Sequence, residues 1–187
     1  KAEALYNAAD RRWVIDHHGT NPHFGQINWV EGDVPATGIL VNRLYRAMNA
    51  PLTKEAAVCL YTALSTDTGN FVYDSVNGEC FEMMAGLMEA GLPLAEISRV
   101  LFREKREDFV RLLAVTLPSL RVTEAGCVAG LCTSLEHFRQ NGLDPAETDG
   151  VVDYAIDIQG VCMAYYLHQQ GENAVKASLR ALPPYRV

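Results

Sequence analysis

The sequence predicts an α/β unit followed by a smaller α+β module. In the first half, one short β-type run at 13–15 is followed by long segments with apolar residues at helical spacing. The last third instead contains several short strand-like runs: 120–122, 127–132, 161–167 and 174–182. The 187 residues suffice for one domain or two small ones, and the apolar content of 49% supports packed cores.

The strand at 13–15 ends in three polar residues, Asp16, His17 and His18. Its aromatic and β-branched residues predict a buried strand, and the carboxyl ends of such strands line the ligand crevice in open α/β sheets. Imidazole and carboxylate groups together suit divalent ions such as Mn²⁺ or Zn²⁺, and neighbouring histidines can divide metal ligation and phosphate contact between them. A solvated turn is the alternative interpretation of this tripeptide.

Two helices are expected next. Residues 39–48 carry an apolar stripe at helical spacing, with Thr37 as the expected N-cap of that helix. Thr37 at this helix N-terminus could instead face an anion such as phosphate. Thr53 caps the following helix, which ends in a hydroxyl-rich stretch around Asp67. Gly69 can take positive φ there, so Asp67 is held at the end of an element. An Asp beside Gly also caps helices or forms Asx turns, and both interpretations of Asp67 stay open.

A charged run at 103–108 marks the expected domain boundary. Before this run, residues 80–89 are helical by composition, with Gly91 as the expected helix terminator. Apolar residues at helical spacing predict further helices at 94–102, before the run, and at 109–117, after it. Interleaved charges of both signs are typical of a solvated linker or helix face. We therefore expect a first domain at 1–104, a helical linker at 105–116 and a second domain at 117–187.

Secondary structure in the second domain alternates between strands and helices. A hairpin turn is expected at 124–126, helices at 135–140 and 149–156, and a hairpin loop at 169–173. His23, His137 and His168 are expected to be ordinary loop or surface histidines. The five cysteines are odd in number and scattered, which predicts reduced core residues: Cys59, Cys80, Cys127, Cys132 and Cys162.

Net charge and hydropathy limit the function classes. The formal charge of −7 argues against sequence-independent binding of long duplexes, which needs many contacts from Lys and Arg to phosphates. Bound divalent cations would reverse the local potential, so short phosphate substrates remain compatible with an acidic protein. No apolar run approaches the length of a membrane span, and we expect a cytoplasmic protein without membrane association.

Four strings occur in the order typical of one family: Val14-Ile15-Asp16-His17-His18, Ala36-Thr37-Gly38, Thr66-Asp67-Thr68-Gly69-Asn70-Phe71 and Ala177-Ser178-Leu179-Arg180. The chain resembles a DHH phosphoesterase over nearly all its length, specifically the bacterial group that degrades very short RNA and removes the 3′-phosphate of phosphoadenosine phosphate. The string Asp-Gly-Val-Val-Asp-Tyr at 149–154 is similar to the DHH-associated substrate-binding domain of that group. The resemblance implies a parallel-sheet DHH domain followed by this α+β domain.

Two motifs of the family are absent. Members carry an Asp-x-Asp motif and an isolated Asp before the Asp-His-His strand, and a Gly-Gly-Gly-His motif after the Ser-Leu-Arg strand. We therefore expect an internal fragment, with the first domain incomplete at its N-terminus and the second at its C-terminus. Such a fragment would supply about half of the ligands of a two-metal site and would have little activity by itself.

The resemblance also implies roles for single residues. His17 would be a direct metal ligand and Asp67 a ligand to the same or both of two Mn²⁺ ions, with Mg²⁺ as the alternative metal. His18 would donate to the phosphate, and Asp16 would orient an imidazole. Arg180, assisted by Ser178, would bind a terminal phosphate bidentately. Without the resemblance, Ser178 and Arg180 would be assigned to the polar face of an alternating strand.

The expected function is metal-dependent hydrolysis of short oligoribonucleotides or of 3′-phosphoadenosine 5′-phosphate. The alternatives within the family are a cyclic-di-AMP phosphodiesterase, a processive single-strand exonuclease and an inorganic pyrophosphatase. Binding of a nucleotide or a partner chain without catalysis is the non-enzymatic alternative. The family resemblance also leads us to expect a homodimer.

Overall fold

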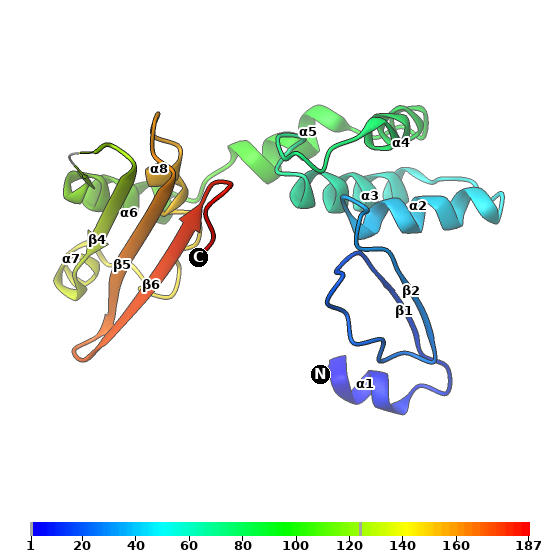
Figure 1. Ribbon diagram of the computed structural model, residues 1–187, viewed down its shortest axis with the longest axis horizontal. Helices are drawn as coiled ribbons and strands as arrows, with labels where there is room; N and C mark the ends of the chain where they lie inside the picture. Colours follow the sequence, from blue (N-terminus) through cyan, green and yellow to red (C-terminus); the bar gives the residue numbers. More distant parts are fainter. Residues whose placement is uncertain (1, 124) are drawn as a thin grey trace. The chain divides into compact units, whose positions relative to one another are not determined.

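The computed structural model describes residues 2–123 and 125–187, which form two compact units, Lys1–Glu104 and Lys105–Val187 (Figure 1). Each unit has its own hydrophobic core. The segment 105–116, expected as a linker, contains helix α6 (Glu107–Thr116). Because Leu112 and Leu113 of this helix are buried in the second core, the helix is part of the second unit.

The first unit places a two-stranded sheet beside three longer helices. Its elements are α1 (Ala2–Ala8), β1 (Trp13–Asp16), β2 (Ile27–Val30), α2 (Thr37–Ala47), α3 (Lys54–Asp67), α4 (Gly78–Glu89), α5 (Leu94–Ser98) and the π-helical turn η1 (Arg99–Arg103). The strands are parallel, as predicted, with Trp13 opposite Ile27 and Asp16 opposite Val30. Their carboxyl ends therefore lie at the same edge. Strand β1 is less buried than the sequence predicted, because Trp13 is 62% exposed and only Val14 of this strand is buried.

Helices α2, α3 and α4 enclose the first core with apolar side chains that recur at helical spacing: Ile39, Leu40, Leu60, Tyr61, Leu64, Met83 and Leu87. Full burial of one such side chain contributes about 1.5–3 kcal/mol. Close approach of α2 to α3 needs Gly38, because a Cβ at this position would lie 3.1 Å from the Cβ of Ala63. The sequence therefore fixes which faces of the helices meet.

The helix ends agree with the sequence at some positions and differ at others. Thr53 caps α3 as predicted, since its hydroxyl accepts from the amide of Ala56 at 3.2 Å. Gly91 follows α4 with φ of +87°, as expected of a terminator. The prediction of Thr37 as N-cap of α2 was wrong by one residue. Ala36 holds the cap position with no side-chain hydrogen bond, and Thr37 begins the helix.

A charged network ties the helices to the strand edge. Arg43 of α2 donates from Nε and Nη2 to the two carboxylate oxygens of Glu79, both at 2.7 Å, and from Nη1 to Glu31 at 2.6 Å. Trp29 of β2 donates its indole N–H to Glu31 at 2.7 Å. These bonds lower the pKa of both carboxyl groups. The network holds the residue after β2 against α2 and α4, and so fixes the edge where β1 also ends.

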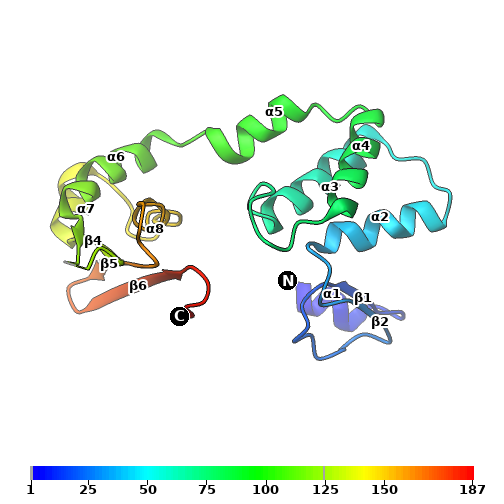
Figure 2. The same cartoon turned by 45° about the horizontal axis from the view of Figure 1, so that its top comes forward.

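In the second unit, three helices cover one face of a four-stranded sheet. The remaining elements are the 3₁₀ turn η2 (Leu117–Ser119), β3 (Arg121–Val122), β4 (Val128–Thr133), α7 (Leu135–Asn141), α8 (Asp153–Ile156), β5 (Met163–Gly171) and β6 (Ala174–Ala181). The strand order is β3-β4-β5-β6, with β4 and β5 parallel and the outer pairs antiparallel. Figure 2 shows α6, α7 and α8 on one side of this sheet.

The expected α+β pattern of the second unit is confirmed, with corrections at the turns. Helix 149–156 was predicted too long, because Gly150 takes φ of +86° and α-helix begins only at Asp153. The loop at 169–173 was also predicted too long, since the strands continue to Gly171 and resume at Ala174. Glu124 of the turn at 124–126 lies outside the described residues, and Gly126 there has φ of +72°.

The cysteine prediction was only partly right. All five cysteines are free, as expected for a reduced protein, but only Cys80 is buried, while Cys59 and Cys132 are exposed. Helix and strand faces decide this, because Cys132 projects from the face of β4 opposite to the buried Leu131. Within 2–123 and 125–187, no helix has the length and apolar character needed to cross a membrane.

The prediction that His168 is a surface histidine was wrong. Its side chain is 1% exposed and stacks on Tyr166 of the same strand, with ring centroids 5.0 Å apart. Its Nε2 lies 3.5 Å from the hydroxyl of Thr148, and the described residues give Nδ1 no hydrogen-bond partner. Burial, together with the charge of Lys176, lowers the pKa of His168. The alternation of β5 places it on the helix-covered face.

We expect the second unit to lose stability on acidification through His168. The folded state keeps the ring neutral, whereas the unfolded chain takes up a proton as the pH falls below about 6.5. The free energy of unfolding should therefore fall from pH 7 downward, by at most about 1.4 kcal/mol per pH unit for one proton. Urea denaturation of the His168→Phe variant across this range should show a smaller slope. His137→Gln, an exposed histidine of the same unit, should keep the wild-type slope, and an unchanged slope in His168→Phe would contradict the assignment.

Candidate functional site

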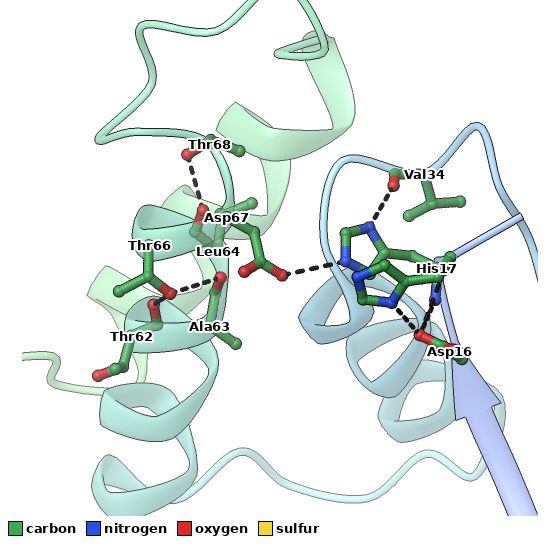
Figure 3. Close-up of polar contacts among 10 residues, drawn as sticks. Asp16, His17, Val34, Thr62, Ala63, Leu64, Thr66, Asp67 and Thr68 are labelled. Carbon is green, nitrogen blue, oxygen red and sulfur yellow. Dashed lines mark hydrogen bonds and ion pairs between the residues drawn. The ribbon is translucent and has the colours of Figure 1, made fainter. Parts of the chain in front are cut away.

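The carboxylate of Asp16 accepts hydrogen bonds from four donors at the end of β1. Figure 3 shows this carboxylate beside His17. Oδ1 accepts from Nδ1 of His18 at 2.7 Å and from the backbone amides of His17 at 2.8 Å and His18 at 3.2 Å. Oδ2 accepts from the side-chain amide of Asn21 at 2.6 Å. The bonds from Asn21 and His18 hold the pKa of Asp16 well below its usual range. Asp16 is therefore an ionised acceptor that organises the residues after the strand.

His18 presents one ring nitrogen to its surroundings. Because an ionised carboxylate can only accept, the Nδ1 that contacts Asp16 carries the proton of the neutral ring. Its Nε2 then remains for another partner, and the side chain is 70% exposed. A second proton on Nε2 would make the ring an imidazolium that donates at both nitrogens. Asp16 thus orients the imidazole of His18 rather than that of His17.

His17 is oriented by a different group. Its Nδ1 donates to the backbone carbonyl of Val34, 3.1 Å away, in the segment that leads into α2. This bond places the proton on Nδ1 and leaves a lone pair on Nε2, which lies 3.4 Å from Oδ2 of Asp67. A histidine whose far nitrogen is held by a carbonyl is typical of metal ligands. The pair therefore joins the end of β1 to the end of α3.

Asp67 reaches this position because other residues close α3. The hydroxyl of Thr68 donates to the carbonyl of Leu64 at 2.7 Å and accepts from the amide of Phe71 at 3.2 Å. Gly69 follows with φ of +57°, where a Cβ would clash with the ring of Tyr73. The helix end is thus satisfied by Thr68, and the carboxylate of Asp67, with 39% side-chain exposure, extends towards His17.

The donor chemistry of this pair fits a cation. A neutral Nε2 and a carboxylate both present lone pairs, so they attract each other only when a proton or a metal ion lies between them. Nitrogen and oxygen donors together suit ions such as Mn²⁺ and Zn²⁺. Within the residues that the structure describes, no three His, Cys, Asp or Glu side chains gather around one point. His17 and Asp67 therefore fit a metal as two of its ligands.

Ser178 and Arg180 lie on β6 in the second unit. They are opposite Tyr166 and Ala164, both buried, so their side chains belong to the helix-covered side of the sheet. Arg180 donates from Nε to Oδ1 of Asp153 at 3.2 Å and from Nη1 to the carbonyl of Leu179 at 3.1 Å. The guanidinium is half-exposed, and the described residues give its Nη2 no hydrogen-bond partner. Asp153 and the carbonyl of Leu179 thus hold Nε and Nη1, and Nη2 is the nitrogen left for another partner.

The structure brings together Asp16, His17, His18 and Asp67 of the expected site residues, while Ser178 and Arg180 belong to the other unit. Sequence reasoning missed Asn21 and the carbonyl of Val34. Asn21 precedes Pro22, and this dipeptide indicates only a turn. A backbone carbonyl leaves no signal in the residue type, so nothing in the sequence pointed to Val34.

A solved structure shares this fold. An exopolyphosphatase-related protein from Bacteroides fragilis superposes with a TM-score of 0.84 over 92% of this chain and 51% of its own, at 28% identity. The sequence also matches the bifunctional oligoribonuclease and PAP phosphatase NrnA of Thermus thermophilus, at 29% identity over 89% of this chain and 49% of the relative. A probable enzyme of the same name from Streptococcus mutans is 23% identical over 89% of this chain and 53% of the relative.

These similarities confirm the resemblance to DHH-family phosphoesterases that the motifs predicted. No family model matches the sequence. The chain spans about half the length of the relatives it matches, 49% in one case and 53% in the other.

Proposed function

We propose that the protein is a metal-dependent phosphoesterase that hydrolyses short oligoribonucleotides and 3′-phosphoadenosine 5′-phosphate. The observation that carries this proposal is the pair of lone-pair donors, Nε2 of His17 and Oδ2 of Asp67, 3.4 Å apart with the His17 tautomer fixed by Val34. The names of the relatives, an oligoribonuclease and PAP phosphatase, support the substrate class.

Two Mn²⁺ ions are the proposed cofactor, with His17 and Asp67 as ligands. When bound, such ions lower the pKa of a water molecule and stabilise charge on the leaving oxygen. Further ligands would come from the Asp-x-Asp motif and the isolated Asp of the family pattern. The mixed nitrogen and oxygen donors support Mn²⁺, and Mg²⁺ is the alternative ion.

The residues around Asp16 have a separate task in this proposal. His18 donates to the scissile phosphate from Nε2, which requires the imidazolium, since its Nδ1–H is already given to Asp16. The carboxylate of Asp16 accepts from Nδ1 of this ring and keeps it in one direction. His18, oriented by Asp16, therefore offers a donor to the phosphate, and neither residue is a metal ligand.

Arg180 is the proposed group for a terminal phosphate of the substrate, with Ser178 assisting. A guanidinium offers two parallel N–H groups to a phosphate, and Asp153 already fixes one edge of this side chain by its bond to Nε. Fixing the side chain in advance reduces the entropy lost on binding.

Cytoplasmic location and a homodimer complete the proposal. The five free cysteines favour a reducing compartment, where disulfides are rare. The dimer rests on the family resemblance alone.

Mn²⁺-dependent hydrolysis by the full-length protein tests the proposed function. A labelled RNA dinucleotide, a long single strand, phosphoadenosine phosphate and cyclic di-AMP are compared at equal concentration. We expect turnover of the dinucleotide and phosphoadenosine phosphate to exceed that of the other two. Preference for the long strand or the cyclic dinucleotide would move the protein to another branch of the family. Metal binding without any hydrolysis would contradict the enzymatic proposal.

Replacing either proposed metal ligand should abolish most of the activity. We expect His17→Ala and Asp67→Ala each to lower kcat/KM by at least about 100-fold and to weaken Mn²⁺ binding, because each removes a donor that no neighbour replaces. Metal affinity is measured by electron paramagnetic resonance of free Mn²⁺. Asp74→Ala removes an exposed carboxylate seven positions after Asp67 and is the matched control. Wild-type metal affinity in both ligand variants would overturn the assignment.

Replacing Arg180 should affect binding more than turnover. We expect Arg180→Ala to raise KM for phosphoadenosine phosphate by about 10-fold or more, with a smaller change in kcat, because a charge-assisted bidentate contact is lost. Arg180→Lys should recover only part of the loss, since lysine keeps the charge but not the planar fork. Lys176→Ala changes a cation four positions away on the same strand face and should leave KM unchanged. Unchanged kinetics in both Arg180 variants would contradict the phosphate-binding assignment and leave Arg180 as a polar residue on the face of the strand.

A further inference from the structure

Asn21 closes the loop that follows the Asp-His-His motif. Its Nδ2 donates to Oδ2 of Asp16 at 2.6 Å, and its backbone amide donates to the carbonyl of His18 at 2.9 Å. Its Oδ1 accepts from the amide of His23 at 2.8 Å, a residue whose φ of +55° turns the chain there. Asn21 therefore contacts the motif through both its side chain and its backbone.

The two oxygens of Asp16 have different partners. Oδ1 receives all three donors from the histidine pair, and Oδ2 receives Asn21. The torsion that rotates an Asp carboxylate has broad, shallow wells, so bonds to one oxygen leave the group free to swing. A donor on Oδ2 fixes the plane of the carboxylate. The lone pair of Oδ1 that accepts from the His18 ring is then held in one direction.

We propose that Asn21 is a positioning residue, which acts through Asp16 to hold the imidazole of His18 in the direction needed to contact the substrate phosphate. The inference rests on the proposed function, because it assigns a purpose to the orientation of His18. Among the hydrogen bonds described above, Asn21 makes none to the side chains of His17 or Asp67, the proposed metal ligands. It makes none to the imidazole of His18 either, so it acts on that ring only through Asp16.

The separate support of the two histidines makes the proposal specific. The ring of His17 is held by the carbonyl of Val34, which has no bond to Asn21 or Asp16 among the described hydrogen bonds. Loss of the Asn21 amide should therefore disturb His18 and leave the metal-binding nitrogen of His17 in place. A residue that merely stabilised the fold would affect both histidines together.

Kinetics and metal binding of the full-length protein give the first test. We expect Asn21→Ala to lower kcat by about 10- to 100-fold while Mn²⁺ affinity stays within about twofold of wild type. Asn21→Asp keeps the shape but replaces the donor with a second carboxylate, and its loss should be at least as large. Asn28→Ala is the control. The side chain of Asn28 also holds a loop, by hydrogen bonds to the amide and carbonyl of Gly25, and its removal should leave kcat unchanged.

Nuclear magnetic resonance of the metal-free protein gives a test that does not depend on hydrolysis. In the wild type, the ring-nitrogen chemical shifts of His18 should report one tautomer with the proton on Nδ1, and Asn21→Ala and Asn21→Asp should both shift His18 towards a mixture of tautomers. The ring-nitrogen shifts of His17 should be unchanged in every variant. Unchanged His18 shifts in both Asn21 variants, a wild-type kcat in Asn21→Asp, or a kcat loss in Asn28→Ala equal to that in Asn21→Ala would each overturn the proposal. Absence of hydrolysis in the wild type, with the His18 result as expected, would refute the proposed function alone.

Discussion

The site depends on one ionised carboxylate at the end of a parallel strand. Asp16 accepts four hydrogen bonds because the chain turns directly after β1, which brings the next two backbone amides and the side chains of His18 and Asn21 to its oxygens. The Arg43 network fixes that edge from the other side, by holding Glu31 after β2 against α2 and α4. Removing the carboxylate of Asp16 would leave the ring of His18 and two backbone amides without their acceptor, which is why the geometry of the loop follows from this residue.

Two adjacent histidines gain different properties because separate elements support them. His17 takes its tautomer from the carbonyl of Val34, at the entrance to α2, and faces the end of α3. His18 takes its tautomer from Asp16 and remains exposed. Each ring has one nitrogen committed to the protein and one left for chemistry. This division suits the proposed function, in which His17 would hold a metal and His18 would contact the phosphate.

In the second unit, too, a carboxylate orients a side chain, through the longer contact between Asp153 and Arg180. Asp153 follows the turn that Gly150 imposes and accepts from Nε of Arg180, so an edge strand carries a guanidinium held on one side. Both groups are about half exposed, and the pair therefore adds little to stability. In the proposed function, the pair would hold the Arg180 side chain ready for an anion. The buried His168 on the neighbouring strand has the opposite character, because burial keeps that ring neutral.

Local patterns in the amino-acid sequence were enough to predict most of the elements. Alternation and helical spacing located most strands and helices, Thr53 and Gly91 marked helix ends, and the residues His17 and Asp67, selected from the sequence, lie 3.4 Å apart in the structure. The burial of His168, the exposure of Cys132 and the cap position of Ala36 in place of Thr37 follow from tertiary contacts. The same contacts bring the carbonyl of Val34 to the ring of His17 and the side-chain amide of Asn21 to Asp16. Local patterns depend on neighbours along the chain, whereas burial and tautomers depend on groups that folding brings together from distant segments.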